Sequence, residues 1–472
     1  MLRRTKIIAT VGPATDDPAE LKRVVAAGVD LARVNFSHGT AGQHAQRIQE
    51  IRDVAAACNR YVGIMVDLQG PKIRIEGFED GRVQLIEGSP FVLDMMLGAK
   101  AGTAERVGVT YKRLSADVKP GDTLLLDDGN IVLRVEYVFP GEIQCRVVTG
   151  GILSNGKGLN RLGGGLSAEA LTDKDRADIR EAARQSADYL AVSFIRSADD
   201  INHARELLRQ AGGQGHVIAK VERPEAILNI DEVIRAADAV MIARGDLGVE
   251  LGDAELPGIQ KRIAQLARQH GRVVITATQM MQSMVESPQP TRAEVLDVAN
   301  AVMDGSDAVM LSAETAVGRH PHKVVAAMDR ICLGAERQRF ILTTNPRFDA
   351  SFENTEEAIA LSAMYCATHA NVKAIVAMTE SGATARWMSR ISSGIPIFAF
   401  SRQTSALRRV TLYRGVYPLH LDPELDPARA ESRAVETLLR LGIVATGDSI
   451  VITKGERHGV AGGTNALKII EA

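Results

Sequence analysis

The sequence predicts an α/β fold whose main domain is a (β/α)₈ TIM barrel. Eight short apolar runs recur along the 472-residue chain, and most neighbouring runs are separated by a segment with helix start and stop signals. Apolar strands that alternate with helices are typical of a parallel sheet buried on both faces, and eight such units close a barrel. The runs are residues 6–12, 31–36, 61–68, 189–194, 216–222, 239–246, 273–278 and 308–315.

This alternation of apolar runs and helical segments is interrupted once, between the third and fourth runs. From residue 70 to residue 166 the sequence changes to short alternating strands separated by turn glycines and by D-G and P-G dipeptides. We therefore predict an all-β domain inserted after barrel strand 3, with the form of a small β-barrel. The insertion follows the carboxyl end of a strand, so it is placed to act as a lid that closes over the site and excludes water.

A third domain follows the barrel. Residues 1–69 and 167–340 are assigned to the barrel, residues 70–166 to the insertion and residues 341–472 to the C-terminal domain, whose first part (341–354) has the composition of a linker. Asn354, with Glu357 three residues on, predicts a helix start. Apolar runs then alternate with helical segments, so an open α/β sheet is expected, with strands at 374–379, 395–400, 416–421, 449–455 and 466–470.

Composition excludes several classes of protein. The net charge is −2 and aromatic residues make up 4% of the chain, whereas a nucleic-acid partner requires a basic patch and stacking residues. No apolar run reaches the roughly 18 residues of a membrane span, and the N-terminus lacks a signal-peptide core, so we expect a cytoplasmic protein with no membrane partner. The four cysteines are scattered singly, which argues against both disulfides and zinc: Cys58, Cys145, Cys332 and Cys366.

Charged residues at the ends of two neighbouring runs indicate where the chemistry lies. Lys220 and Glu222 end the fifth run and project to the same side of a strand, and Asp246 follows the sixth run where a strand is expected to give way to a loop. Two carboxylates and a lysine suit a divalent ion that holds a phosphorylated substrate. The alternative is a buried Lys–Glu ion pair and an unrelated turn aspartate.

Polar residues also follow most of the other runs. The carboxyl ends of all barrel strands meet at one rim, where barrel enzymes place their active sites. This convergence favours the active-site interpretation over the buried ion pair. The additional rim residues are Asn35, Ser37, His38, Asp67, Thr278, Ser312 and Glu314.

Two glycine-containing stretches could bind phosphate. Residues 151–157 match the first seven positions of a P-loop, but Gly158 stands where Ser or Thr is needed and no helix follows, so a Walker-type site is excluded. Lys157 then either is solvated or reaches a phosphate. In the third domain, Thr379 to Thr384 joins a strand to a helix; three hydroxyls exceed the needs of one helix cap, which favours an anion site over simple capping.

Six motifs, in order, give the sequence a resemblance to the pyruvate kinases over nearly its whole length. They are residues 33–39 (RVNFSHG), 67–74 (DLQGPKIR), 219–222 (AKVE), 243–248 (ARGDLG), 276–281 (TATQMM) and 311–315 (LSAET). The resemblance implies Mg²⁺-dependent (or Mn²⁺-dependent) phosphoryl transfer from phosphoenolpyruvate to ADP, giving pyruvate and ATP in the final step of glycolysis. It also implies a homotetramer.

The resemblance assigns roles by position. Glu222 and Asp246 resemble the Mg²⁺ ligands, and Lys220 resembles the lysine that neutralises charge on the phosphoryl group and the enolate. The backbone at Gly245 and Asp246, with the Thr278 hydroxyl, resembles the substrate-carboxylate cradle, and Thr278 lies near the carbon that is protonated. Further positions resemble a phosphate contact, Arg33, and nucleotide contacts, His38, Arg74 and Lys157.

The sequence departs from the family pattern at the potassium site. Members that require K⁺ hold it with residues matching Asn35, Ser37, Asp67 and the Leu68 carbonyl, and carry glutamate where this chain has Lys72. An ammonium there can supply the charge of a potassium ion, so activity without K⁺ is expected.

Two further departures concern the effector and the nucleotide. The resemblance places a sugar-phosphate effector at Thr379, Ser381, Gly382 and Thr384, but residues 454–459 lack the tryptophan-containing loop of members activated by fructose 1,6-bisphosphate. A monophosphate activator, such as a hexose or pentose phosphate or AMP, is therefore expected. Gln43 replaces an aromatic that some members use beside the nucleotide, which leaves the nucleotide preference open.

Two rival functions also fit part of the sequence. A Mg²⁺-dependent aldolase or carboxylyase of pyruvate-type substrates would share Glu222 and Asp246, but it would need neither the inserted domain nor Lys157. A catalytically silent phosphosugar sensor would use only the third domain, and the intact set of Lys220, Glu222, Asp246 and Thr278 argues against it.

Overall fold

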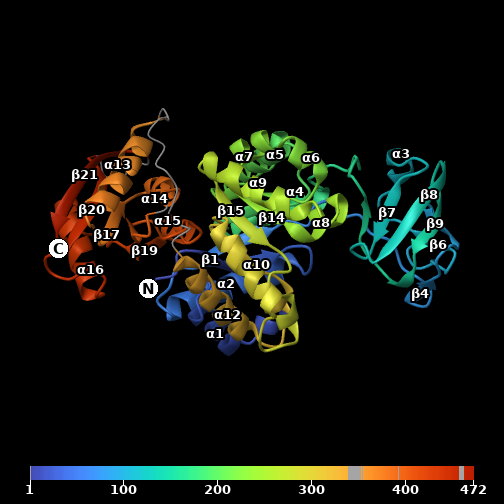
Figure 1. The fold of residues 1–472 in the computed structure, drawn as a ribbon, viewed down its shortest axis with the longest axis horizontal. Coiled ribbons are helices and arrows are strands. Elements are labelled where there is room, and N and C mark those ends of the chain that lie inside the picture. Colours follow the sequence, from blue (N-terminus) through green and yellow to red (C-terminus); the bar gives the residue numbers. More distant parts are fainter. Residues whose placement is uncertain (1, 339–351, 353, 392, 457–461) are drawn as a thin grey trace.

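The computed structural model describes residues 2–338, 352, 354–391, 393–456 and 462–472. Three domains follow one another along the long axis of the molecule, with the barrel between the C-terminal domain and the inserted domain (Figure 1). Most of the expected linker at 341–354 and the second half of the 454–459 loop lie outside the described residues.

All eight predicted runs form the parallel strands of one closed barrel. Each strand pairs with the next in the order β1-β2-β3-β12-β13-β14-β15-β16, and β16 closes on β1 with Ala308 opposite Lys6. The strands are β1 (Lys6–Val11), β2 (Leu31–Asn35), β3 (Gly63–Asp67), β12 (Tyr189–Val192), β13 (His216–Val221), β14 (Ala239–Ala243), β15 (Val273–Ala277) and β16 (Ala308–Leu311).

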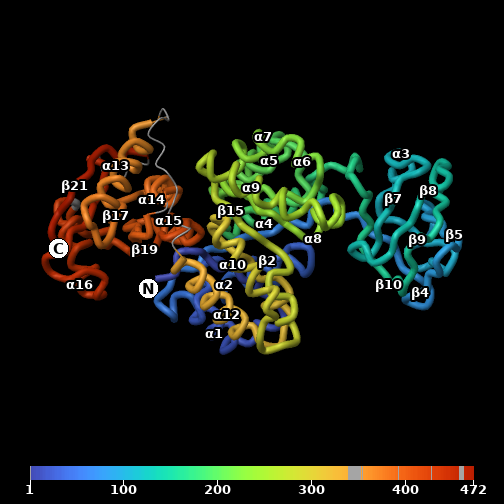
Figure 2. Tube along the Cα trace, in the orientation of Figure 1, coloured from blue at the N-terminus to red at the C-terminus, as the bar shows by residue number. Residues whose placement is uncertain are grey.

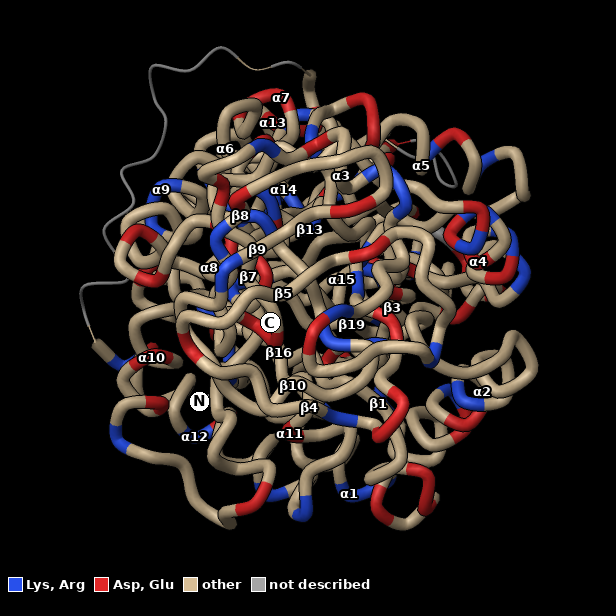
Figure 3. The backbone as a smooth tube through the Cα atoms, turned by 90° about the vertical axis from the view of Figure 1, so that its right-hand side faces the viewer, with Lys and Arg blue, Asp and Glu red and all other residues tan. Residues whose placement is uncertain are grey.

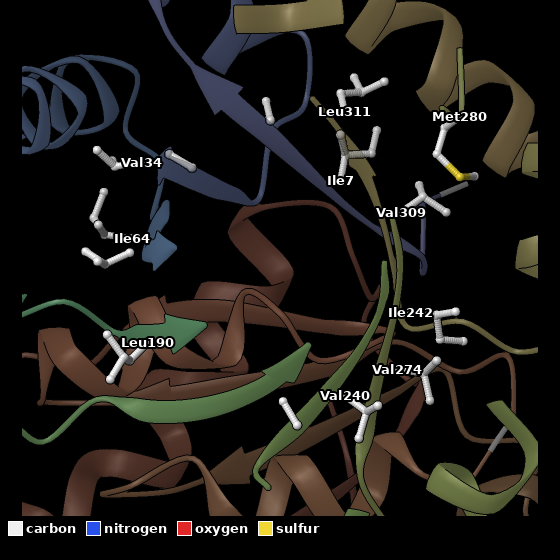
Figure 4. Packing of buried hydrophobic residues seen from close by; sticks show 14 of the residues in the cluster. Ile7, Val34, Ile64, Leu190, Val240, Ile242, Val274, Met280, Val309 and Leu311 are labelled. Atoms are coloured by element: carbon white, nitrogen blue, oxygen red, sulfur yellow. The ribbon is translucent and has the colours of Figure 1, made fainter. Parts of the chain in front are cut away.

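Helices cover the outside of the barrel. Alternate strand residues point outward into one apolar core with the helices, as Ile7, Val309 and Leu311 do in Figure 4. Several of these helices begin with a capping box; in α2, Thr40 and Gln43 cap each other. The helices are α1 (Pro18–Ala26), α2 (Ala41–Ala57), α4 (Asp173–Arg184), α5 (Ala198–Gln210), α6 (Pro224–Leu228), α7 (Ile230–Ala236), α8 (Arg244–Leu251), α9 (Leu256–Gln269), α10 (Arg292–Met303), α11 (Ala313–Ala316) and α12 (Pro321–Glu336).

The other strand residues fill the barrel interior. Ile8, Leu31, Met65 and Ile218 belong to an apolar cluster that continues without a break into the C-terminal domain. That domain therefore packs against the amino ends of the barrel strands. Its position leaves the opposite rim for the site.

The C-terminal domain has the expected open α/β architecture. Its sheet order is β19-β18-β17-β20-β21, in which only the β20–β21 pair is antiparallel. Asn354 caps the first helix by accepting from the amide of Glu357, as predicted. The elements are α13 (Thr355–His369), β17 (Ala374–Met378), α14 (Ala383–Ser389), β18 (Ile397–Ser401), α15 (Thr404–Val410), β19 (Val416–His420), α16 (Ala430–Arg440), β20 (Ser449–Gly455) and β21 (Thr464–Glu471).

The inserted domain is built almost entirely from strands. It forms a six-stranded sheet, β11-β7-β8-β9-β5-β6, and a two-stranded sheet of β4 and β10, rather than the single closed β-barrel that the strand spacing suggested. Isolated bridges such as Ile75–Val109 and Phe78–Gly102 extend the pairing beyond the named strands. The elements are β4 (Arg82–Leu85), β5 (Pro90–Asp94), β6 (Arg106–Gly108), α3 (Leu114–Asp117), β7 (Thr123–Leu126), β8 (Ile131–Phe139), β9 (Glu142–Thr149), β10 (Gly151–Ser154) and β11 (Leu159–Arg161). Residues 151–157 thus lead from one strand toward another, which agrees with the exclusion of a P-loop.

The chain enters and leaves this domain through two paired segments, residues 72–75 and 157–160, which we call the connector (Figure 2 shows the two passages). The amide of Ile75 donates to the carbonyl of Lys157 at 2.9 Å, and the amide of Leu159 donates to that of Ile73 at 2.9 Å. Between these bonds Arg74 forms an antiparallel bridge with Gly158. The two passages therefore form one paired unit.

Basic and acidic residues are interspersed in the view from the end of the molecule that carries the inserted domain (Figure 3). This pattern agrees with the nearly balanced net charge. Among the described residues, no helix combines the length and the apolar character needed to cross a bilayer.

Candidate active site

A polar layer lies directly above the apolar interior of the barrel. Thr10, Arg33, Asp67 and Lys220 each stand two residues after an interior residue of the same strand, so they project to the same side as Ile8, Leu31, Met65 and Ile218. Ser193 occupies the equivalent place after Ala191 at the end of β12. The strand alternation that builds the core thus also aims these five side chains into the barrel mouth.

Lys220 is held by three oxygen atoms. Its Nζ lies 2.9 Å from Glu222 Oε1, 3.1 Å from Asp67 Oδ1 and 2.6 Å from the hydroxyl of Ser193. Burial opposes the ammonium charge, but the two carboxylates outweigh it and raise the pKa of Lys220 to about 12. Lys220 therefore remains a fixed positive charge throughout the physiological pH range.

Arg33 and Asp67 form the second half of the layer. The Nε of Arg33 lies 2.6 Å from Asp67 Oδ2, and its Nη1 donates to the hydroxyl of Thr10 at 3.0 Å. Burial alone would raise the pKa of Asp67, but the cations of Lys220 and Arg33 outweigh it and lower that pKa. Asp67 is thus the shared counter-ion of both cations, and Lys220 has Glu222 as a second carboxylate partner.

The negative charges of Glu222 and Asp246, the predicted Mg²⁺ ligands, lie close enough to interact, and their joint binding of one ion stays a prediction. Burial raises the pKa of Glu222; the Lys220 ammonium opposes this shift, and the negative charge of Asp246 adds to it. Both side chains follow the carboxyl ends of adjacent strands, β13 and β14. Two hard oxygen donors near each other fit a divalent cation.

A pair of carboxylates is a donor set of the kind that Mg²⁺ uses. Within the described ranges, no group of three or more His, Cys, Asp and Glu side chains gathers as a metal site. Mg²⁺ commonly takes one or two carboxylates and completes its shell with water and substrate phosphate oxygens. Glu222 and Asp246 meet that requirement.

Asp246 lies in a helix, which corrects the expected strand-to-loop transition. Helix α8 begins at Arg244, directly after β14, so Asp246 stands in its first turn. A carboxylate is favourable there because the amino end of a helix carries partial positive charge. The helix also fixes the direction of the side chain more firmly than a loop would.

The turn after β15 is held in an unusual conformation beside this helix. Thr278 has φ of 69°, a left-handed value that is rare for a β-branched residue. The amide of Gly245 donates to the Thr278 hydroxyl at 2.8 Å, so the two predicted cradle groups are in contact. Arg244 pairs with Asp297 at 2.7 Å and donates to the Thr278 carbonyl at 2.8 Å, which holds the turn in place.

The expected potassium ligands lie at the ends of β2 and β3, where Asn35 is the register partner of Asp67. Asn35 Oδ1 accepts from the Ser37 amide at 3.1 Å, and the Leu68 carbonyl accepts from Ser193 at 2.7 Å.

In the part of the chain described, Lys72 forms no side-chain hydrogen bond or ion pair with any of these four residues. Its Nζ instead lies 2.9 Å from Asp246 Oδ1, so it brings positive charge to the other side of the site.

The three predicted nucleotide residues come from two domains. Arg74 and Lys157 lie on the connector: Arg74 donates to the Gly156 carbonyl at 2.8 Å, and Lys157 pairs with Asp127 at 2.7 Å. His38 is exposed on the barrel rim after β2. Gln43 uses its side-chain oxygen to accept from the Thr40 amide at 2.9 Å, so its contact here is a helix cap.

The sequence analysis did not identify Ser193, Thr10 or Arg244 as site residues. Ser193 alternates with the interior residues of its strand, and Thr10 precedes the end of the first run, so position relative to the core could have revealed both. The Arg244–Asp297 contact could not be read from the sequence because it joins residues 53 positions apart. Glu314, expected at the rim, is fully buried and accepts from the Met281 amide at 3.1 Å and the Ser312 amide at 2.7 Å.

The predicted effector loop joins β17 to α14 in the C-terminal domain. The Thr379 hydroxyl accepts from the Gly382 amide at 2.9 Å, and Gly382 has φ of 87°, so the turn is tight. The Thr384 hydroxyl is buried and lies 2.6 Å from Glu356 and 2.7 Å from Thr464. The Thr384 hydroxyl therefore anchors the end of the loop to the interior of the domain.

Comparison with known proteins identifies the family. The profile "Pyruvate kinase, barrel domain" matches residues 2–325, and "Pyruvate kinase, alpha/beta domain" matches residues 357–470. The chain belongs to the pyruvate kinase family. It is 54% identical to pyruvate kinase II of Salmonella typhimurium over 99% of this chain and 98% of that protein. It is 51% identical to pyruvate kinase of Haemophilus influenzae over 96% of each chain, and 41% identical to that of Corynebacterium glutamicum over 99% of this chain and 98% of the relative.

Family membership confirms the predicted class of enzyme. The protein is a phosphotransferase that acts on phosphoenolpyruvate and ADP, and it forms pyruvate. The barrel, the inserted all-β domain and the C-terminal α/β domain are confirmed as its architecture.

Proposed function

We propose that Lys220, Arg33 and Thr278 carry the phosphoryl transfer, with Glu222 and Asp246 holding the Mg²⁺. The observation that supports this most directly is the Lys220 ammonium, fixed between Asp67 and Glu222 at the barrel mouth. When bound, Mg²⁺ (or Mn²⁺) supplies Lewis-acid polarisation of phosphoryl oxygens. The donor set of Glu222 and Asp246 fits that ion, as described above.

The residues of the chain supply positive charge where the phosphoryl group passes. A loose phosphoryl-transfer transition state depends on positioning and electrostatic stabilisation more than on covalent chemistry. Lys220 and Arg33 share Asp67 as a common counter-ion, so neither has to reorganise as charge moves from phosphoenolpyruvate toward ADP. Thr278, beside the Gly245 amide, orients the substrate carboxylate and stands by the enolate carbon.

The test is formation of pyruvate from phosphoenolpyruvate and ADP, followed by coupled oxidation of NADH. Lys220→Met is expected to lower kcat by about 10³-fold or more because a preorganised charge of this kind is worth several kcal/mol. Glu222→Gln should raise the Mg²⁺ concentration needed for half-maximal rate. Formation of pyruvate without ADP would favour the rival aldolase or carboxylyase function. Full activity of Lys220→Met would contradict the catalytic role assigned to Lys220.

We further propose that activity does not require K⁺, because Lys72 brings an ammonium to the site. Rates measured in tetramethylammonium buffer should change less than twofold on addition of K⁺, an ion whose charge the lysine replaces. Lys72→Glu should acquire a dependence on K⁺. Strong activation of the unaltered protein by K⁺ would contradict the proposal.

We also propose that the loop of Thr379, Ser381 and Gly382 binds a phosphate monoester, such as a hexose or pentose phosphate or AMP, as an activator. The loop precedes α14, whose Trp387 is the single tryptophan of the chain and lies against Gly271 of the barrel. Trp387 fluorescence should therefore respond to an activator. The response should disappear in Ser381→Asp, which places a negative charge in the loop; a response to fructose 1,6-bisphosphate alone would contradict a monophosphate ligand.

The homotetramer implied by the resemblance and the cytoplasmic location expected from the sequence composition stay predictions. Light scattering of the purified protein tests the first, with a particle of about four chains expected.

A further inference from the structure

Helix α8 contacts both passages of the connector. Asp246 and Glu250 lie four residues apart on α8, and this spacing places them on one face. Asp246 Oδ1 lies 2.9 Å from the ammonium of Lys72, on the passage that enters the inserted domain. Glu250 Oε1 accepts from the Asn160 amide group at 3.0 Å, on the passage that leaves it.

The two contacts differ in how well they are protected from water. Glu250 and Asn160 are 4% and 5% exposed, and the Glu250 carbonyl also accepts from the Gly163 amide at 2.8 Å. The side chains of Lys72 and Asp246 are 25% and 20% exposed. An ion pair that water reaches contributes little to stability. The contact between Lys72 and Asp246 therefore breaks at a smaller cost in free energy than the buried contact between Glu250 and Asn160.

The Lys72 ammonium and a divalent cation require the same carboxylate. Two positive charges on one Asp246 side chain repel each other, so a bound ion weakens the contact between Asp246 and the ammonium. Residues 73–75 are paired to residues 157–159, so displacement of Lys72 is transmitted to the paired connector. The buried Glu250–Asn160 contact keeps the other passage in place.

We propose that Lys72 is a built-in competitor for the divalent cation at Asp246, so that metal binding releases one passage of the connector from helix α8. The inserted domain is thereby held in one position before metal binding and is freed to pivot about the Glu250–Asn160 contact afterwards. This inference rests on the proposed placement of Mg²⁺ at Glu222 and Asp246. It gives Lys72 a positioning role in addition to its charge.

Direct metal titration tests the competition. Mn²⁺ binding to the substrate-free protein is followed by the decrease of the free-ion electron paramagnetic resonance signal. Lys72→Met should bind Mn²⁺ about fivefold more tightly, the order of effect expected from removing one partly exposed ion-pair partner. Lys119→Met is the matched control, because Lys119 is an exposed lysine of the inserted domain with no ion pair in the described part of the chain. Equal affinities for unaltered protein, Lys72→Met and Lys119→Met would overturn the proposal.

Hydrogen exchange separates competition from a simple charge effect. The amides of Ile75 and Leu159 report on the connector because each donates across it. Once the contact between Lys72 and Asp246 is lost, the entering passage has lost its tie to helix α8, and its pairing with the leaving passage opens more often. Saturating Mg²⁺ should therefore accelerate exchange of both amides in the unaltered protein by about threefold or more. In Lys72→Met, exchange should be fast without metal and should not respond to it. Unchanged or slower exchange in the unaltered protein on adding Mg²⁺ contradicts the release.

A third variant distinguishes failure of this inference from failure of the proposed metal site. Asp246→Asn should lose most Mn²⁺ affinity if Asp246 is a ligand. If Asp246→Asn binds Mn²⁺ normally, the metal assignment itself is wrong. If Asp246→Asn loses binding while Lys72→Met behaves as the unaltered protein, the metal assignment holds and only the competition is refuted.

Discussion

Ser193 offers a sharp test of how the active site is positioned. Its hydroxyl lies 2.6 Å from Lys220 Nζ and donates to the Leu68 carbonyl at 2.7 Å, and it is 1% exposed. Ser193→Ala removes one of the three oxygen partners of the ammonium and leaves the two carboxylates. We therefore expect Lys220 to stay charged but to lose its fixed orientation.

The magnitude follows from the hydrogen bond that is lost. A hydrogen bond to a charged group contributes about 1.5–3 kcal/mol, and each 1.36 kcal/mol of transition-state stabilisation is about tenfold in rate. The two remaining ion pairs retain part of the orientation, so kcat should fall roughly 10- to 100-fold with little change in KM for ADP. The Leu68 carbonyl also loses its donor, which should destabilise the fold by about 1 kcal/mol and lower Tm by a few degrees.

A matched control separates positioning from stability. Ser306 is equally buried and lies 2.8 Å from the Thr276 hydroxyl, next to Asp307 at the amino end of β16 and away from Lys220. Ser306→Ala should lower Tm by a similar amount and leave kcat unchanged. The reasoning is refuted if Ser193→Ala retains kcat within about twofold, or if Ser306→Ala loses as much activity.

Three further changes test other parts of the structure. Arg244→Lys cannot reproduce the paired contacts of a guanidinium that hold the Thr278 turn, so kcat should fall about tenfold in steady-state assays, and an unchanged kcat would show that the clamp is dispensable. Arg390→Met leaves the buried carboxylate of Asp307 without the guanidinium that lies 2.7 Å away, and it should cost about 3–5 kcal/mol in the free energy of unfolding, measured by urea titration. Burial lowers the pKa of Lys6 to about 8. The unfolded chain, with its lysine pKa near 10.5, therefore binds more protons than the folded chain between about pH 8 and 10.5, so stability rises with pH there by up to about 3 kcal/mol. Lys6→Met should flatten this rise, and a slope that persists in Lys6→Met would assign it to another group.

Local pattern alone predicted much of the architecture. Apolar runs alternating with helices located all eight barrel strands, and the change to period-two alternation located the inserted domain. Strand alternation also placed Lys220 on the interior-facing side, because every second side chain of a strand faces the same way. These features depend on neighbours within a few residues, which the sequence displays directly.

Contacts between distant segments were decided by the tertiary structure. Ser193 meets Lys220 because β12 pairs with β13, and Lys220 reaches Asp67 because β3 pairs with β12 across the whole inserted domain. The Thr384 hydroxyl is hydrogen-bonded to Glu356 and Thr464, which lie 28 and 80 positions away in the sequence. Of the three hydroxyls counted in this loop, that of Thr384 is therefore engaged within the domain. Periodicity determines which way a side chain points, whereas strand order and packing determine what it meets. The pairing of Lys72 with Asp246, 174 positions apart, is likewise set by strand order and packing.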